Sequence, residues 1–259
     1  MILYLSCTGN TLWAARQLAA ATGERLVSIT DIKGNGTDFS LEEGERLGFC
    51  FPVHGWRPPK LLRNCIRSLH FLNPAGHFTY AVCTAGDNIG EAMDLLTNDL
   101  KNIGIKLDSA YSLIMPESYV GLPFMDVDKQ CKEQQKIETS QSRLNEIITE
   151  VTHRNAGIFR LDRGNWPKVN SRIIGGFFTN CLITDKPFHV NSYQCVHCGT
   201  CGKVCPVGDI SMTEGVIPKW NHNGRCLTCF SCYHHCPRHA IEYGGRTKGK
   251  GQYFFGIKH

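Results

Sequence analysis

The sequence predicts an α/β protein built on a doubly wound parallel sheet of five strands, followed by a smaller α+β domain rich in cysteine. Strand-like and helix-like segments alternate along the first part of the chain, which is typical of a parallel sheet with helices on both faces. Eight of the 14 cysteines crowd between Cys195 and Cys236. We therefore expect four units: a sheet domain, a connector with a short helix, a cysteine-rich domain and a basic aromatic tail, at residues 1–157, 158–190, 191–243 and 244–259.

The third expected strand, LGFCFPV, is almost entirely apolar, as a strand covered on both faces must be. The five strands are expected at residues 1–5, 25–29, 47–53, 78–84 and 107–115, and the helices near residues 11–21, 59–71, 88–103 and 128–154. Such sheets bind ligands at the carboxyl ends of the strands beside the switch point, here the first and third strands.

Small and polar residues connect the first strand to the first helix: Ser6, Cys7, Thr8, Gly9, Asn10 and Thr11. One interpretation is an ordinary turn with a helix N-cap, although a turn needs only one or two such residues. The other is a phosphate site, because the free N–H groups at the start of a helix, with hydroxyls beside them, attract a dianion.

The connector contains the segment SRIIGGFFTN, which is expected to form a short apolar helix between the domains. Its alternative is an amphipathic segment lying on a membrane. Nowhere is an apolar run long enough to span a membrane. The N-terminus has no secretion signal and the remaining cysteines are scattered, so a cytoplasmic location is expected.

The formal net charge is +5, but the acid-free tail contributes four basic residues, Arg246, Lys248, Lys250 and Lys258. The rest of the chain is close to neutral, so we expect no nucleic-acid partner. The tail is expected either to dock an acidic redox partner or to pack back through Tyr253, Phe254 and Phe255.

The pattern C-x2-C-x2-C-x3-C-P occurs twice, starting at Cys195 and at Cys226. Zinc sites commonly use two C-x2-C pairs separated by a longer loop. Three cysteines at successive two-residue gaps instead suit three corners of an iron–sulfur cubane, with the fourth ligand coming from a distance. The repeat therefore favours two clusters over zinc.

Residues 191–243 thus resemble a bacterial two-cluster ferredoxin, with Pro206 and Pro237 also matching that family. The resemblance implies two [4Fe-4S] clusters in which the fourth cysteine of each motif binds the other cluster. The implied ligands are Cys195, Cys198, Cys201 and Cys236 for one cluster, and Cys226, Cys229, Cys232 and Cys205 for the other. The five histidines of this region, His197, His222, His234, His235 and His239, are expected at the surface.

SCTGNT resembles the phosphate loop of flavodoxins, which implies a flavodoxin-like sheet and FMN as a cofactor. In that family two further loops hold the flavin ring, and here they correspond to Pro52, Val53, His54, Gly55 and Trp56 and to Thr84, Ala85, Gly86 and Asp87. Trp56 is expected either to stack on the ring or to pack between domains. Asp87 is expected either to line the ring or to cap the next helix.

Taken together, the chain resembles single-chain flavodoxin–ferredoxin fusions of anaerobes. Its segment MPESY has Ser118 where an asparagine is usual in that group. Tyr119 is expected to contact the flavin, to contact the ferredoxin domain, or simply to pack.

This resemblance implies an electron-transfer iron–sulfur flavoprotein that exchanges electrons with a redox partner protein. An alternative is a flavin-dependent reductase that acts directly on a small oxidised substrate. No G-x-G-x-x-G nicotinamide motif is present, and His54 and Asp87 are the acid–base groups near the flavin loops. A third hypothesis is a redox sensor, but the sequence contains no DNA-binding motif.

Overall fold

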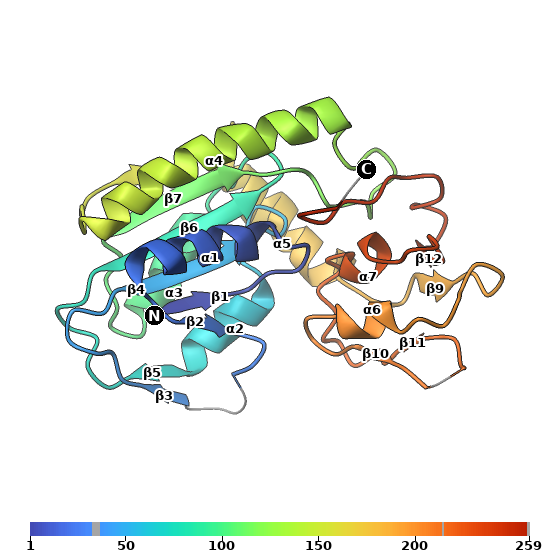
Figure 1. Ribbon diagram of the computed structural model, residues 1–259, viewed down its shortest axis with the longest axis horizontal. Coiled ribbons are helices and arrows are strands. Elements are labelled where there is room, and N and C mark those ends of the chain that lie inside the picture. Colours follow the sequence, from blue (N-terminus) through green and yellow to red (C-terminus); the bar gives the residue numbers. More distant parts are fainter. Residues whose placement is uncertain (33–36, 214, 258–259) are drawn as a thin grey trace.

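A computed structural model describes residues 1–259 except 33–36, 214 and 258–259. Its main sheet is parallel and has six strands, in the order β2-β1-β4-β6-β7-β8. The strands are β1 (Ile2–Tyr4), β2 (Leu26–Ser28), β4 (Leu47–Pro52), β6 (Thr79–Ala85), β7 (Ser109–Ile114) and β8 (Phe159–Arg160). The first five follow the flavodoxin-like order, with the switch point between β1 and β4 (Figure 1).

The sixth strand was not expected from the sequence. β8 is only two residues long, and both residues are exposed. Its sequence therefore has no alternation of apolar and polar residues from which a strand could be predicted. A second small parallel pair, β3 (Thr37–Phe39) with β5 (Leu69–Phe71), was also missed. The helix expected over residues 59–71 ends at Ser68, because residues 69–71 alternate between buried and exposed in the pattern of a strand.

Two helices cover each face of the main sheet. α1 (Asn10–Thr22) and α4 (Gln130–Thr152) share one apolar layer, to which Leu18 and Leu144 belong. α2 (Lys60–Ser68) and α3 (Ala92–Lys101) share the other, to which Ile66 and Leu96 belong. This second layer also includes Val207 and Leu227 of the cysteine-rich domain, so the core is continuous across the domain boundary.

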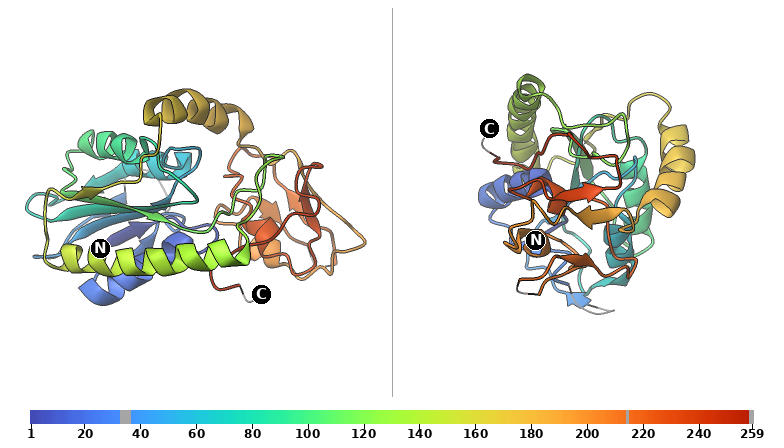
Figure 2. Two further views of the ribbon diagram at one scale, coloured as in Figure 1. Left: turned by 90° about the horizontal axis from the view of Figure 1, so that it is seen from above. Right: turned by 90° about the vertical axis from the view of Figure 1, so that its right-hand side faces the viewer.

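The connector forms one helical stretch made of the π-helix η1 (Val169–Ile174), α5 (Gly175–Phe177) and the π-helix η2 (Phe178–Leu182). It lies on the opposite side of the molecule from α4 (Figure 2). Ser171, Gly175 and Thr179 are buried, whereas Ile173 and Phe177 are exposed. The helix therefore packs one face against the protein.

In the residues that the structure describes, the cysteine-rich domain has two small antiparallel pairs and two short helices. β9 (Phe188–Val190) pairs with β12 (Ile241–Tyr243), and β10 (Ile210–Ser211) pairs with β11 (Lys219–Trp220). The helices, α6 (Thr200–Lys203) and α7 (Ser231–His234), each begin inside one of the two cysteine motifs.

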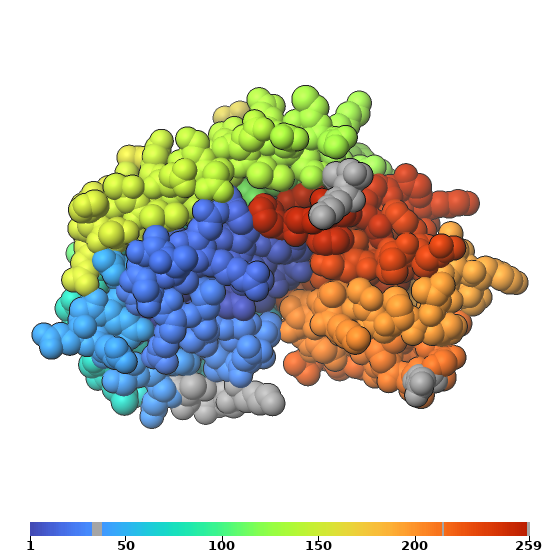
Figure 3. All heavy atoms as spheres, in the orientation of Figure 1, coloured from blue at the N-terminus to red at the C-terminus, as the bar shows by residue number. Residues whose placement is uncertain are grey.

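The tail returns to the sheet domain and lies between α1 and the cysteine-rich domain (Figure 3). Phe255 donates its N–H to the carbonyl of Thr8 (2.8 Å) and stacks on Trp13 (5.2 Å between centroids). Phe254 stacks on His235, with centroids 4.1 Å apart. The aromatic residues of the tail thus pack back onto the protein. In the part of the chain that the structure describes, no helix is long and apolar enough to cross a membrane.

Candidate functional site

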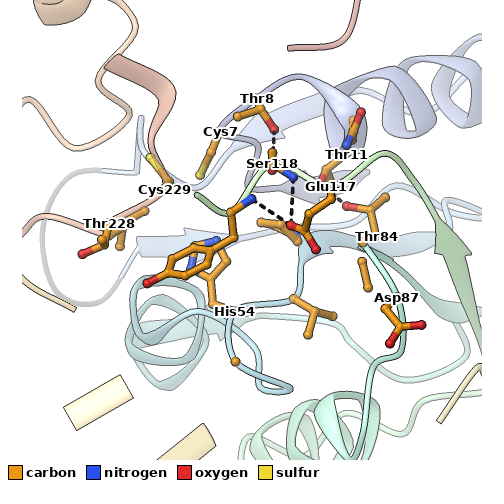
Figure 4. A pocket seen from close by; sticks show the side chains of 18 of the residues that line it. Cys7, Thr8, Thr11, His54, Thr84, Asp87, Glu117, Ser118, Thr228 and Cys229 are labelled. Atoms are coloured by element: carbon orange, nitrogen blue, oxygen red, sulfur yellow. Dashed lines mark hydrogen bonds between the residues drawn. The ribbon is translucent and has the colours of Figure 1, made fainter. Parts of the chain in front are cut away.

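A cavity of about 250 Å³ opens at the carboxyl ends of β1, β4 and β6, between the sheet and the cysteine-rich domain. Figure 4 shows side chains that line it. All the residues expected to hold the cofactor line this cavity except Gly9: Ser6, Cys7, Thr8, Asn10, Thr11, Pro52, Val53, His54, Gly55, Trp56, Thr84, Ala85, Gly86 and Asp87. The three loops singled out in the sequence therefore meet around one space.

The loop after β1 turns into α1 through Gly9, whose φ of +95° favours glycine. Several side chains in this loop already have protein partners. Ser6 Oγ accepts the N–H of Leu12 (3.2 Å), and Thr11 Oγ1 pairs with Thr84 Oγ1 (2.7 Å). Thr8 Oγ1 has a longer contact with Ser118 Oγ (3.4 Å).

The side chain of Asn10 links the loop to two distant segments. Its Nδ2 donates to the carbonyl of Pro116 (3.2 Å), and its Oδ1 accepts the hydroxyl of Tyr253 (2.6 Å). This amide therefore holds the loop in place. Apart from the N–H of Leu12, which Ser6 accepts, the N–H groups at the start of α1 and the Thr8 hydroxyl are the groups that fit a phosphate.

The loop after β4 is a tight turn at His54–Arg57, where His54 and Arg57 exchange backbone hydrogen bonds of 2.9 and 3.2 Å. Gly55 and Trp56 both have positive φ values. Burial lowers the pKa of His54 to about 4, so its imidazole is neutral near pH 7. The carbonyl of Trp56 accepts the Ser171 hydroxyl (2.9 Å), so Trp56 both lines the cavity and contacts the connector helix.

The loop after β6 contributes Asp87, which lines the cavity. α3 begins at Ala92 with Glu91 at the N-cap position, so the alternative that Asp87 caps this helix is wrong. Four residues, 88–91, separate Asp87 from the first helical residue, and a turn in which Ala92 donates its N–H to the carbonyl of Ile89 (3.0 Å) leads into the helix.

Glu117 also lines the cavity and was not identified from the sequence. Its Oε1 accepts the N–H groups of Ser118 (2.8 Å) and Tyr119 (2.7 Å). Burial raises its pKa even though these bonds act in the opposite direction. Only its position in the MPESY segment, beyond the last expected strand, could have pointed to it.

The cysteine-rich domain forms the other wall of the cavity through Leu227, Thr228 and Cys229. Tyr119 lies edge-on to Phe178 of the connector and to Phe230 of the cysteine-rich domain, each at 5.3 Å between centroids. Tyr119 therefore contacts the cysteine-rich domain and lines the cavity as well.

The eight motif cysteines line two small cavities in two groups of four. Cys195, Cys198, Cys201 and Cys236 surround one, and Cys205, Cys226, Cys229 and Cys232 surround the other. These are the two ligand sets that the ferredoxin resemblance implies. Across the described residues, no three His, Cys, Asp or Glu side chains are arranged to hold a single metal ion.

Backbone and hydroxyl groups point at these sulfurs. N–H groups of Asp209 and Ala240 donate to Cys205 and Cys236, each at 3.2 Å. A hydrogen bond with the Thr200 hydroxyl (3.3 Å) lowers the pKa of Cys198. Donors at sulfur stabilise thiolates, which are the form that binds iron, so the residues fit [4Fe-4S] clusters.

The two groups differ in position. Cys229 lines both its own cysteine cavity and the large cavity at the sheet. The group containing Cys195 shares no residue with the large cavity, and Cys198 is exposed. One set of cysteines is thus next to the large cavity, and the other is next to the outer surface.

The expectation of surface histidines is wrong for His234, which is 1% exposed, whereas His197, His222 and His239 are exposed and His235 is half-buried. His234 Nε2 donates to the carbonyl of Ser118 (2.7 Å), and Nδ1 accepts the N–H of Tyr253 (3.1 Å). It joins three segments that are distant in sequence, which is why local sequence gave no sign of its burial.

Comparison with known proteins places residues 188–237 in the family of 4Fe-4S dicluster domains. This part of the chain is therefore an iron–sulfur domain, which supports a redox role. No curated protein matches the chain.

Among solved structures, the chain is similar to an FMN-dependent NADH-azoreductase from Bacillus anthracis, in complex with FMN. The identity is 7%, the match covers 58% of this chain and 98% of the other, and the TM-score is 0.40. It is also similar to the rubredoxin oxygen:oxidoreductase of Desulfovibrio gigas, with 15% identity, coverage of 58% and 36%, and a TM-score of 0.31.

Proposed function

We propose that this protein is an electron-transfer iron–sulfur flavoprotein of the flavodoxin–ferredoxin type. FMN would occupy the large cavity and two [4Fe-4S] clusters the two groups of cysteines. Flavins exchange one or two electrons, whereas iron–sulfur clusters exchange one at a time. The proposal keeps the units that the sequence predicts: a flavin domain at residues 1–157, a connector at 158–190, a two-cluster domain at 191–243 and a tail at 244–259.

The observation that carries this proposal is the position of Cys229. This residue belongs to one group of cysteines and also lines the cavity that the sheet loops surround. A cluster held there would be the one next to the flavin, while the group with the exposed Cys198 would be the one that a redox partner protein reaches. The protein would then pass single electrons between a partner and the flavin by way of two clusters.

The residues of the cavity suit FMN. The helix N-terminus and Thr8 would hold the phosphate, and Trp56 and Tyr119 would contact the ring. His54, neutral because burial lowers its pKa to about 4, would add no positive charge near the ring.

The first test is a stepwise reductive titration of protein purified without oxygen, followed by absorbance and EPR, with iron and flavin quantified. About eight iron atoms and one FMN per chain are expected. Absence of flavin, or zinc in place of iron, would contradict the proposal.

Two matched variants test the order of the clusters. Cys226→Ser removes a ligand of the group next to the cavity without altering the cavity lining, and Cys195→Ser removes a ligand of the outer group. Each variant is expected to lose about half of the iron and to keep flavin. When a one-electron donor protein reduces each variant in a stopped-flow experiment, the flavin should be reduced more slowly than in the wild type. Flavin reduction at the wild-type rate in Cys226→Ser would exclude the proposed order.

Glu117 favours a second candidate function, direct reduction of a small oxidised substrate in the cavity. Its carboxyl group lines the cavity and burial raises its pKa, so it is suited to donate a proton. The test is anaerobic oxidation of the reduced protein by small quinones and nitroaromatics. Turnover that falls at least tenfold in Glu117→Gln would support this candidate, and oxidation unaffected by the substitution would exclude a role of Glu117 in it.

A further inference from the structure

A short segment between β7 and α4 lies between the large cavity and solvent. Leu122 and Met125 of this segment line the cavity, whereas Phe124 between them is 83% exposed. One side of the segment therefore faces the cavity, and its other side faces solvent. This segment, residues 120–126, is the cover loop.

The cover loop is bound by a single lysine of the tail. Lys250 Nζ donates to the carbonyls of Val120 (3.0 Å), Leu122 (2.5 Å) and Met125 (2.5 Å). An ammonium group has three N–H donors, so all three are used within this one loop. Figure 1 shows the tail beside the chain that leads from β7 to α4.

Two further residues of the tail bind the same loop. Arg246 Nη1 donates to the carbonyl of Gly121 (3.4 Å), and the N–H of Gly251 donates to Asp126 Oδ1 (3.0 Å). Among the residues that the structure describes, the cover loop makes its other hydrogen bonds only within itself and to its neighbour Val127. The polar contacts that fix this loop at the cavity therefore come from the tail.

Lys250 makes the strongest of these contacts. Hydrogen bonds from a charged donor are stronger than those between neutral groups, and three of them converge on this ammonium group. Without it, three carbonyls of the cover loop would lose their donor. Water would replace the donor most readily if the loop moved outward, away from the cavity.

We propose that Lys250 is a positioning residue that holds the cover loop closed over the flavin cavity. The closed loop keeps small oxidants away from the flavin, so that the flavin exchanges electrons with the clusters instead. Closed loops serve other active sites in this way, because they exclude solvent and prevent side reactions. This inference rests on the proposed function, and it gives the tail a part in selecting the electron acceptor.

The test compares Lys250→Met, which removes the three donors, with Lys248→Met at an exposed position of the same tail. FMN binding to flavin-depleted protein and FMN release after dilution of the holoprotein are both followed by fluorescence without oxygen. In Lys250→Met both association and dissociation should be at least tenfold faster than in the wild type, because an open loop no longer blocks the entrance. Lys248→Met should match the wild type.

The direction of the change in association rate separates an open entrance from a damaged site. Faster release of FMN with unchanged or slower association would overturn the inference, because it indicates a less stable binding site. Unchanged rates in Lys250→Met, or the same change in Lys248→Met, would also overturn it.

Oxidation by a small molecule gives a second readout. The reduced holoprotein is mixed with a small water-soluble quinone in an anaerobic stopped-flow experiment, and the absorbance of the flavin is followed. Oxidation of the flavin should be at least tenfold faster in Lys250→Met than in the wild type and in Lys248→Met. Equal rates in all three proteins would overturn the inference, since the loop would then not shield the flavin.

A third measurement needs no variant and applies even if Lys250→Met fails to fold. Addition of FMN to flavin-depleted wild-type protein should slow hydrogen exchange in residues 120–126 and 246–251 together, because the two segments close as one unit. Slowing confined to the loops after β1, β4 and β6 would overturn the inference. Failure of the proposed function would look different, since the wild-type protein itself would then lack iron or bind no FMN.

Discussion

Single residues near the cavity serve to join distant segments as much as to line it. Asn10 connects the first loop to Pro116 and to Tyr253. His234 connects α7 to Ser118 and to the tail. These side chains therefore couple the shape of the candidate flavin site to the fold of the cysteine-rich domain.

His234 should make the protein sensitive to acid. Burial lowers its pKa from 6.5 to about 4, so between pH 6.5 and pH 4 the unfolded chain binds a proton that the folded chain does not. Stability is then lost as the pH falls through this range, by about 2 kcal/mol between pH 7 and pH 5. In the folded protein Nδ1 of His234 accepts the N–H of Tyr253. Protonation would place a hydrogen on Nδ1, so two donors would face each other and this hydrogen bond would be lost.

The measurement is the thermal midpoint of the anaerobic protein at pH 7 and at pH 5. The side chain in His234→Gln keeps one donor and one acceptor but does not titrate. Its thermal midpoint should therefore fall by about 4–8 °C less between pH 7 and pH 5 than that of the wild type. His239→Gln, at an exposed position, is the control and should follow the wild type. An equal fall in all three proteins would rule out His234 as the source.

At the scale of elements, the connector helix supports the loop after β4. Ser171 donates to the carbonyl of Trp56 and accepts the N–H of Glu91 at 2.7 Å. Arg57 Nη1 donates to the carbonyl of Ser171 (2.8 Å). The helix thus holds the turn at His54–Arg57 against the cavity.

Two adjacent glycines in this helix allow a matched test. A Cβ on Gly175 would overlap the carbonyl oxygen of Gly55, whereas a Cβ on Gly176 would have no atom within 4 Å. Gly175→Ala should therefore push the helix away from the turn, with a loss of about 1–3 kcal/mol of stability and at least tenfold weaker flavin binding. Gly176→Ala should keep flavin affinity and gain up to about 1 kcal/mol from helix propensity.

Thermal unfolding and fluorescence titration of flavin-depleted protein with FMN measure these two quantities. The pair is informative because the residues are neighbours in one helix and differ in what they face. Equal behaviour of the two variants would mean that the helix does not support the cavity loop.

At the scale of the whole molecule, the tail connects the two ends of the chain. Tyr253 is buried and its hydroxyl donates to Asn10 (2.6 Å). Gln252 Nε2 donates to the carbonyls of Tyr233 (2.6 Å) and Cys236 (2.9 Å). The tail therefore belongs to the interface between the sheet and the iron–sulfur domain.

Tyr253→Phe should destabilise the protein by about 1–2 kcal/mol, because Asn10 Oδ1 would lose its partner in a buried position. Flavin affinity should fall with it, since Asn10 holds the first loop. Tyr193→Phe, at a tyrosine that is 98% exposed, is the control for removing a hydroxyl. Thermal unfolding and FMN titration of both variants give the comparison, and a flavin affinity unchanged in Tyr253→Phe would contradict the link between tail and loop.

The fold class and the iron–sulfur domain could be predicted from the sequence because both depend on local patterns. The apolar run LGFCFPV indicates a covered parallel strand, and the spacing of the cysteines from Cys195 and Cys226 is set by the geometry of a cluster. Loops that follow β1, β4 and β6 could likewise be located, since the carboxyl ends of neighbouring parallel strands meet at one edge of a sheet.

The tertiary structure alone decided which surfaces face one another. It brought Cys7, Glu117 and Cys229 to one cavity and buried His234 against Ser118. These placements depend on contacts between segments that are far apart in the chain. The two-residue strand β8 was also beyond prediction. Local sequence determines how a segment folds, whereas long-range packing determines what its side chains meet.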